Sequence, residues 1–428
     1  MTPAEEMGGS GGAGEAAKEG GADGAADSPA APSLRDTWNA LVWHGGSVYD
    51  AWINAVAAQV GSLILTLPYT FSQMGYFFGV ASQFLYGAFG CWTVYLLSLF
   101  HAEASRRTRE YHEVIGIVAG PALGRAVLAF NMVALTFACV LQLIACSSHV
   151  YYMSSRWNKR EWLYLFGALA LPTVLLPSIH NFRVVSILGI ATTTVTSAYM
   201  TVAAVQHGQI EGATHRGPKK LVDFFTGSTN ILFSFGSHGL CIELMEAMWK
   251  PQKYKFAYVA AVLYTYLLTI PDSVAVYWAY GDTLLHRSNA FGVLPPPRRR
   301  MNPELRLQYV AFLLNVNPLF LAWEKLVRVH YSGVFLLKAA ARIPVVLFIW
   351  FLALAIPFFG PINSIMGAFL ISFSVYIIPA CFWISAFIAV WVFILGFGFG
   401  GWASGTTFLR QIRSFGFFDK CYQCPTSH

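Results

Sequence analysis

The stretch Asn230-Ile-Leu-Phe-Ser-Phe-Gly-Ser-His-Gly-Leu-Cys-Ile-Glu-Leu-Met-Glu246 decides how this chain folds. It is apolar enough to lie in a bilayer, but the residues around the histidine at its centre are small: Ser234, Gly236, Ser237 and Gly239. Such residues favour a locally unwound segment over an unbroken membrane helix. Ionisable groups inside a span are costly and by default functional. The stretch therefore predicts an interrupted transmembrane helix that carries a titratable side chain.

Composition indicates that the rest of the chain is also a membrane protein. Of its 428 residues, 56% are hydrophobic and only 11% are charged, against about 25% charged residues in a soluble domain. The net charge is +7, and the acidic segment 1–37, with two cations and seven anions, has −5 of its own, which leaves +12 for the remainder. We expect lipid headgroups to balance the basic loops. A soluble enzyme, a secreted disulfide scaffold and a nucleic-acid binder are excluded.

Apolar runs of the length that a bilayer requires recur along the chain. We expect eleven helices, near residues 50–74, 77–100, 126–152, 162–179, 184–205, 228–248, 256–280, 308–322, 343–358, 361–380 and 382–403. Backbone groups in hydrocarbon must be satisfied within the segment, and the runs are too long for barrel strands, so the fold is predicted to be all-α. Three regions follow: a disordered Gly/Ala-rich tail (1–37), a transmembrane domain (38–409) and a short C-terminal tail (410–428).

Two parts of this pattern are atypical. The eighth run, 308–322, is short for a full span and contains Pro318. Between Arg342 and Arg410 there are 67 consecutive uncharged residues, enough for three helices with almost no loop between the last two. Pro379 is the expected turn there.

The first run contains a second interruption. Gly61-Ser62 and Thr66-Leu-Pro-Tyr69 break its helical pattern. Runs one and six would open two halves of five helices, and interrupted helices at corresponding positions indicate a transporter's binding site at the membrane midplane. The eleventh helix is then an addition. Half-helix N-termini at such breaks suit a carboxylate. The candidate substrate-binding residues are His238, Ser234, Gly236, Ser237, Thr66, Leu67, Tyr69 and Gln59.

His238 is the candidate proton-coupling residue, because its ordinary pKa lies near neutral pH. Burial favours the neutral imidazole and a bound anion favours the protonated one, so proton and anion binding should reinforce each other. The alternative is a structural hydrogen bond between helices. For gating or ion pairing the candidates are Glu243, Glu246, Lys250, Asp50 and Arg183. Asp272 is a further acid inside a span, for which a cavity-lining role and no role remain equally open.

Cysteines do not indicate a metal centre. Five of the seven lie in apolar stretches and are expected to pack as small hydrophobic residues. Cys421 and Cys424 are spaced as half of a zinc site, without a second pair nearby. A thiol or disulfide role is favoured over metal binding.

Several blocks along the chain are long and unusual. They are Trp43-His-Gly-Gly-Ser-Val-Tyr-Asp-Ala-Trp52, Leu65-Thr-Leu-Pro-Tyr69, Gln142-Leu-Ile-Ala-Cys146, His180-Asn181 with Arg183, His207-Gly-Gln209, Ala247-Met-Trp-Lys-Pro-Gln-Lys253, Trp323-Glu-Lys325, Pro357-Phe-Phe-Gly-Pro-Ile-Asn-Ser364, Gly396-Phe-Gly-Phe-Gly-Gly-Trp-Ala-Ser404 and Lys420-Cys-Tyr-Gln-Cys424. With these blocks the chain, from Trp38 to Cys424, resembles the plant auxin influx carriers of the amino acid/auxin permease superfamily.

The resemblance implies an eleven-span carrier with a LeuT-like inverted repeat that imports indole-3-acetic acid with protons across the plasma membrane. It implies a cytoplasmic N-terminus and, after eleven spans, an extracellular C-terminus. It also implies that His238 matches the family's functionally important histidine in the sixth span. The expected partners are an organic acid, protons and membrane lipids, with no cofactor, nucleic acid or obligate protein partner. No enzymatic activity is implied.

The chain departs from the family pattern at Ser237, Glu246 and Asp272, in residues 295–317, and in the short connection between the last two helices. Two alternatives therefore stay open. One is a proton-coupled amino acid permease, which would need a carboxylate for the ammonium group of its substrate. The other is a divergent or misassembled family member that does not transport.

Overall fold

The computed structural model describes residues 46–60, 62–103, 110–153, 156–175, 183–295, 303–381, 385–420 and 422–424. Within these ranges all regular secondary structure is helical and there is no strand, which confirms the all-α prediction. The predicted N-terminal tail, 1–37, lies outside the described residues.

The first two apolar runs form α2 (Val48–Val60), a 3-10 turn η1 (Ser62–Leu65) and the long helix α3 (Leu67–Glu103). Gly75 interrupts α3 with φ 79° and ψ 169°, at the boundary expected between the two runs. A Cβ atom at Gly75 would lie 3.3 Å from the Cα atom of Gly217. Glycine is therefore required there both for its positive φ and for the close approach of the loop.

Four helices follow before the second interruption. They are α4 (Tyr111–Ala119), α5 (Pro121–Met153), α6 (Lys159–Ala170), which continues into the 3-10 segment η2 (Leu171–Leu175), and α7 (Arg183–His207). α5, α6 and α7 correspond to the third, fourth and fifth runs. Glu161 completes a capping box with Asn158 at the start of α6, which fixes where that helix begins.

The second half of the chain starts with α8 (Leu221–Ser234), η3 (Ser237–Leu240) and α9 (Cys241–Ala247). It continues with η4 (Pro251–Lys253), α10 (Tyr254–Tyr280), η5 (Gly281–His286), η6 (Ala290–Gly292) and α11 (Pro303–Leu326). The expectation of a short eighth helix is wrong: α11 has 24 residues. Its ends are polar but helical, and Pro318 lies inside it, as membrane helices tolerate when neighbouring groups satisfy the freed backbone.

The last runs form α12 (Phe335–Ala355), then α13 (Phe359–Ile365), the π-helical η7 (Met366–Ile377) and α14 (Ile378–Cys381). The chain ends with α15 (Ala386–Trp391), the π-helical η8 (Val392–Phe399) and α16 (Gly400–Phe415). Pro379 is not the turn between the last two runs, because it lies within α14 and the helix ends at Cys381. α16 continues six residues, 410–415, into the region predicted as the C-terminal tail.

Seven of the described helices are long and apolar enough to cross a membrane on their own. The remaining runs do not meet this requirement of length and apolar composition. The first and sixth are interrupted, α6 is short, and charged residues lie at both ends of α11. Large apolar side chains face outward on these helices, among them Phe77, Leu267 and Leu336, each more than two-thirds exposed. Such a surface suits lipid and not water.

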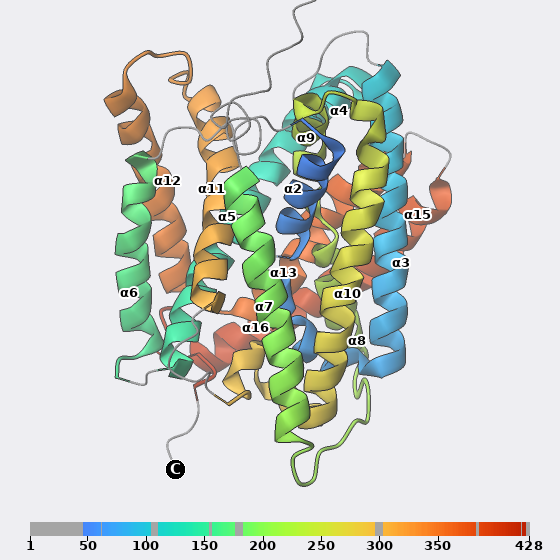
Figure 1. Cartoon of the computed structure of the whole chain (residues 1–428), viewed down its shortest axis with the longest axis vertical. Helices are drawn as coiled ribbons and strands as arrows, with labels where there is room; N and C mark the ends of the chain where they lie inside the picture. Colours follow the sequence, from blue (N-terminus) through green and yellow to red (C-terminus); the bar gives the residue numbers. More distant parts are fainter. Residues whose placement is uncertain are drawn as a thin grey trace, which may run out of the picture.

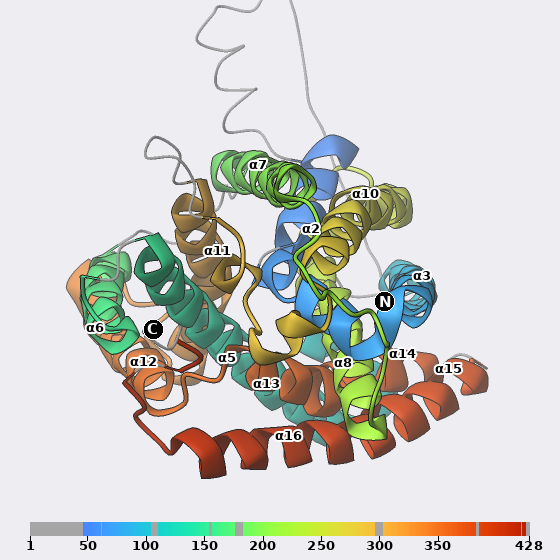
Figure 2. The same ribbon diagram turned by 90° about the horizontal axis from the view of Figure 1, so that it is seen from below.

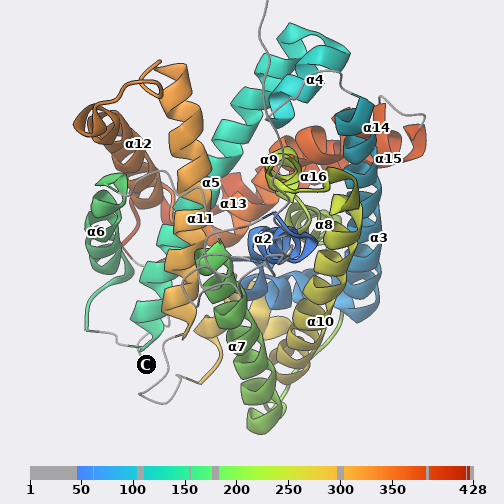
Figure 3. The ribbon, with the colours of Figure 1, turned by 45° about the horizontal axis from the view of Figure 1, so that its top comes forward.

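The helices form a bundle in which α2 is surrounded (Figures 1 and 2). It packs against α10 and α7 and also contacts η3 and α9. Figure 3 shows α2 and α9 near the centre, with α5, α7, α10 and α11 around them. α4 and α9 lie at the upper end of Figure 1, whereas α8 and α16 lie toward the lower end. The two interrupted helices are thus adjacent in the interior, although the inverted repeat itself stays a prediction.

Candidate functional site

The first interruption separates α2 from α3. The carbonyl oxygen of Thr66 accepts hydrogen bonds from the backbone N–H (3.0 Å) and the hydroxyl (3.1 Å) of Thr70, which closes the first turn of α3. Leu67 and Tyr69 are 2% and 7% exposed, and the hydroxyl of Tyr69 accepts a bond of 2.9 Å from Nε2 of Gln73. The predicted interruption is present, and its described side chains face protein and not lipid.

Gln59 lies on the last turn of α2 and is fully buried. Its Oε1 accepts a hydrogen bond of 3.0 Å from the hydroxyl of Thr265 on α10. Its Nε2 has no hydrogen-bond partner among the described residues. A buried amide with an unused donor is the kind of group that can bind a carboxylate oxygen.

The second interruption lies between α8 and α9. Phe235 (φ −102°, ψ 18°) and Gly236 (φ −84°, ψ 25°) leave the α-helical path after Ser234, and η3 follows as a single 3-10 turn. A Cβ atom at Gly236 would lie 2.9 Å from Cγ2 of Ile371 and 3.0 Å from the carbonyl oxygen of Phe233. The break at the predicted position thus depends on a residue without a side chain.

His238 lies in η3 and is fully buried. Its Nε2 is 2.7 Å from the hydroxyl oxygen of Thr93 on α3. Its ring lies near the rings of Tyr258 (centroid distance 5.8 Å) and Tyr376 (6.1 Å). The imidazole is enclosed by protein, as expected for a functional group in a span.

The hydrogen bonds of Thr93 indicate which ring nitrogen of His238 carries a hydrogen. The Thr93 hydroxyl also lies 3.0 Å from the carbonyl oxygen of Phe89 and 3.1 Å from that of Gly90, to which it donates. Because a hydroxyl has one hydrogen, its oxygen accepts from His238, so Nε2 is the protonated nitrogen of the neutral ring. Nδ1 is then the nitrogen that can take up a further proton.

The two interruptions differ in their neighbours. Side chains of the first break bond to α10 through Gln59, whereas His238 of the second break bonds to α3 through Thr93. Ser234 donates within its own helix, to the carbonyl oxygen of Asn230 at 3.3 Å. The candidate substrate residues therefore lie in one central region but in two separate hydrogen-bond groups.

Glu243 and Glu246, which were candidates for gating or ion pairing, both lie on α9. Glu246 lies 3.1 Å from Nε2 of His101 at the end of α3. Glu243 makes no ion pair with Lys250 or Lys253 among the described residues, and Lys250 is exposed. The sequence did not indicate His101 as a partner, because the pairing depends on how α3 and α9 pack.

Asp50 and Arg183 lie at helix starts. The Asp50 carboxylate accepts a hydrogen bond of 2.6 Å from the hydroxyl of Ser47, and bonds of 3.2 Å from the backbone N–H groups of Gly46 and Ser47. These bonds close the turn that leads into α2. Arg183 is the first residue of α7, and its side chain lies outside the described part of the structure.

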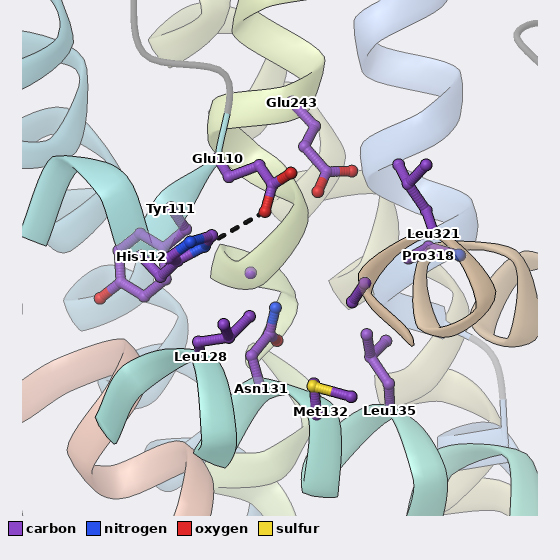
Figure 4. Close-up of a pocket in the computed structure, with 12 residues that line it drawn as sticks. Glu110, Tyr111, His112, Leu128, Asn131, Met132, Leu135, Glu243, Pro318 and Leu321 are labelled. Atoms are coloured by element: carbon purple, nitrogen blue, oxygen red, sulfur yellow. Dashed lines mark ion pairs between the residues drawn. The ribbon is translucent and has the colours of Figure 1, made fainter. Parts of the chain in front are cut away.

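A small cavity of about 20 Å³ opens beside the second interruption, on the side of α9. Figure 4 shows side chains from α4, α5, α9 and α11 around it. Within it Nδ1 of His112 is 3.2 Å from the Glu110 carboxylate, which also forms an ion pair with Lys325. A cavity of this size holds about one water molecule, whereas ligand pockets typically have about 300–1,000 Å³. The cavity is therefore too small for an organic ligand.

Asp272 and Cys424 are two further residues for which the sequence suggested a role. Asp272 is fully buried in α10, and neither of its carboxylate oxygens has a hydrogen-bond partner in the described ranges. Cys424 is disulfide-bonded, which agrees with the thiol or disulfide role favoured over metal. Cys421 lies outside the described residues.

Sequence reasoning missed Thr93, Glu110, His112 and Lys325. Thr93 is a polar residue in an otherwise apolar run, which is a weak signal because threonine often bonds its own helix backbone. Glu110 and Lys325 are 215 positions apart, and no local pattern relates them. Lys325 stands in one of the unusual blocks but was not singled out.

Comparison with known proteins identifies the family of this chain. The family model described as "Transmembrane amino acid transporter protein" matches residues 44–394. The chain is 46% identical over 428 residues to auxin transporter-like protein 1 of Arabidopsis thaliana, covering 90% of this chain and 88% of that protein. The chain belongs to the auxin transporter-like family of transmembrane amino acid transporters.

Other family members are similar to this chain to the same degree. Auxin transporter-like protein 5 of Medicago truncatula is 47% identical over 428 residues, with 90% of this chain and 87% of that protein covered. Auxin transporter-like protein 1 of Oryza sativa subsp. japonica is 46% identical at the same coverages. The chain is thus a multi-pass membrane transporter of the auxin and amino acid permease kind and not an enzyme.

Proposed function

We propose that this protein is a symporter that imports an indole acid, indole-3-acetic acid, together with protons across the plasma membrane. The observation that carries the proposal is the fully buried His238 in the 3-10 break between α8 and α9, adjacent to α2. A titratable ring at a helix break can bind a proton and an organic anion together. The names of the relatives support auxin as the substrate.

The proposed transport cycle depends on the charges of His238 and the substrate and on the side of the membrane to which the site is open. At acidic outside pH, Nδ1 of His238 takes up a proton and the substrate carboxylate binds beside it, which neutralises both charges. The interrupted helices then move against the surrounding bundle and open the site to the cytoplasm. One extra positive charge moving inward gains about 2.3 kcal/mol per 100 mV of inside-negative potential. No cofactor is needed in this cycle.

The proposed orientation places the N-terminus in the cytoplasm and the C-terminus outside the cell. The disulfide at Cys424 supports this orientation, because such bonds persist in oxidising compartments and are rare in the cytosol. The acidic cavity beside α9 would then face the cytoplasm.

Uptake of labelled indole-3-acetic acid into cells tests the proposal. We expect uptake above that of empty cells, rising as the outside pH falls, with the protein demonstrated at the surface. Uptake equal to that of empty cells at verified surface expression would reject the proposal.

An amino acid substrate is the second candidate. The carboxylates of Glu110 and Glu243 both line the cavity beside the second interruption, and a carboxylate is what the ammonium group of an amino acid requires. Competition decides between the two: neutral amino acids should compete with indole-3-acetic acid for uptake only if the protein is an amino acid permease.

A further inference from the structure

The cavity beside the second interruption contains titratable groups that the proposed binding of an indole acid to His238 does not use. Its walls come from the start of α4, from α5, from η3 and α9, and from α11 (Figure 4). The charged or titratable residues that line it are Glu110, Tyr111, His112 and Glu243. They lie at the end of the molecule where α4 and α9 are found, away from α16 (Figure 1).

Most of these groups already have partners. Glu110 forms an ion pair with Lys325 of α11 and lies 3.2 Å from Nδ1 of His112. The other acid of α9, Glu246, lies 3.1 Å from Nε2 of His101. Glu243 differs: within the described part of the chain it makes no hydrogen bond or ion pair, and its carboxylate lines the cavity. α9 therefore carries one engaged and one unengaged carboxylate.

The cavity reaches from this carboxylate to the helix break. Gly239, the residue after His238, forms part of its wall together with Glu243. Gly239 has no side chain to separate the break from the cavity, and a Cβ atom there would lie 3.0 Å from Cγ of Asn131. The volume of about 20 Å³ is enough for about one water molecule between polar groups. One water suffices to relay a proton between groups that do not touch.

We propose that Glu243 accepts the proton that His238 releases and passes it to the cytoplasm. The inference rests on the proposed function, and it adds a named residue for proton release. The imidazolium loses its proton from Nδ1 to a water molecule, and the water gives a proton to the Glu243 carboxylate. The carboxylic acid then loses that proton to solvent at the cytoplasmic end. Charge is conserved at each transfer, and the transporter returns to its starting state.

Charged groups on the elements packed against α9 set the conditions for this transfer. They are Asp50 on α2, His101 at the end of α3, Glu110 just before α4, His112 and Glu113 on α4, and Lys253 in η4; Lys325 on α11 is bound to Glu110. Burial lowers the pKa of His112 below its usual 6.5. His112 is therefore neutral at cytoplasmic pH and adds no positive charge that would hold the carboxylate ionised.

The test compares net uptake with exchange in Glu243→Gln. Net uptake driven by a proton gradient requires the proton to be released inside, whereas exchange of labelled for unlabelled indole-3-acetic acid at equal pH does not. We expect net uptake to fall about 100-fold, the scale of lost proton-transfer groups, while exchange stays within about twofold. Glu243→Asp keeps a carboxylate and should restore part of the net uptake.

The matched control is Glu211→Gln, which removes an exposed carboxylate in the loop after α7 and should leave both measurements unchanged. Equal loss of exchange and net uptake in Glu243→Gln, at normal surface level, would overturn the inference, as would wild-type behaviour in both. If the wild-type protein itself takes up no indole-3-acetic acid, the proposed function fails, and that result is distinct from either outcome of the variant.

Discussion

The two interrupted helices have similar geometry but different chemistry. Each contains a 3-10 turn in the interior of the bundle, η1 in the first and η3 in the second. Around the first the polar groups are neutral, as in Gln59, Thr66 and Tyr69. The second contains His238, with Glu243 one turn further along. We therefore propose substrate positioning for the first break and proton handling for the second.

Among substitutions at the breaks themselves, the largest effect is expected where a side chain closes the second break. Gly236→Val would place a Cβ atom 2.9 Å from Ile371 and 3.0 Å from the carbonyl oxygen of Phe233, and such overpacking costs about 1–3 kcal/mol. We expect uptake to fall more than about tenfold, since that cost opposes the break in every cycle.

Gly405→Val is the control for Gly236→Val, because nothing lies within 4 Å of a Cβ atom at that position. Uptake per surface molecule is the measurement. Normal uptake by Gly236→Val would show that the break is not needed for transport.

A smaller effect is expected for Thr93→Val, which keeps the shape and removes the hydroxyl bonded to His238. A hydrogen bond is stronger to the charged ring than to the neutral one. Half-maximal uptake should therefore require a more acidic outside solution, and the maximal rate should fall about threefold to tenfold. A pH profile that superimposes on that of the wild type would contradict the role given to this contact.

At the first break, Gln59→Leu should weaken substrate binding without changing the pH profile. The change removes the Nε2 donor that has no hydrogen-bond partner among the described residues and that could bind the substrate carboxylate. One hydrogen bond is worth about 0.5–1.5 kcal/mol, or about twofold to tenfold in KM. The measurement is the KM for indole-3-acetic acid at two outside pH values. If the substitution shifts the pH profile and leaves the KM unchanged, the first break does not act in substrate binding alone, and the separate roles proposed for the two breaks are wrong.

The smallest effect concerns His112, outside the membrane spans. Because burial lowers its pKa, the folded protein binds this proton less readily than the unfolded chain, and stability is lost as the pH falls below about 6.5. His112→Gln removes that loss. The melting temperature of the purified protein should therefore fall less between pH 7.5 and 5.5 in the variant than in the wild type. An equal fall in both proteins would contradict the contribution of His112 to acid destabilisation.

The fold and the helix breaks could be predicted because they depend on local sequence. Long apolar runs indicate the helices, and small residues around His238 indicate the break, since both effects act within a few residues. Pro379 misled the prediction, because a proline inside a membrane helix is tolerated where tertiary contacts compensate for it. α11 was expected to be too short, because hydropathy measures apolar length and helices continue into polar residues.

The contacts of the site could not be predicted from local pattern. Thr93 and His238 are separated by 145 positions. Glu110 meets Lys325 only because α4 and α11 both pack against α5. Such pairs depend on helix packing angles that no short stretch determines. The same holds for Glu246 and its partner His101, which lie on different helices far apart in the sequence.

The pH profile of indole-3-acetic acid uptake by His238→Gln, measured beside the wild type at matched surface levels, tests the central claim most directly. Entry of the acid into cells without the carrier is subtracted at each pH. We predict that wild-type uptake rises as the outside pH falls from 7.5 to 5, and that the variant is slow and insensitive to pH over the same range. A variant that follows the wild-type profile would contradict proton coupling through His238.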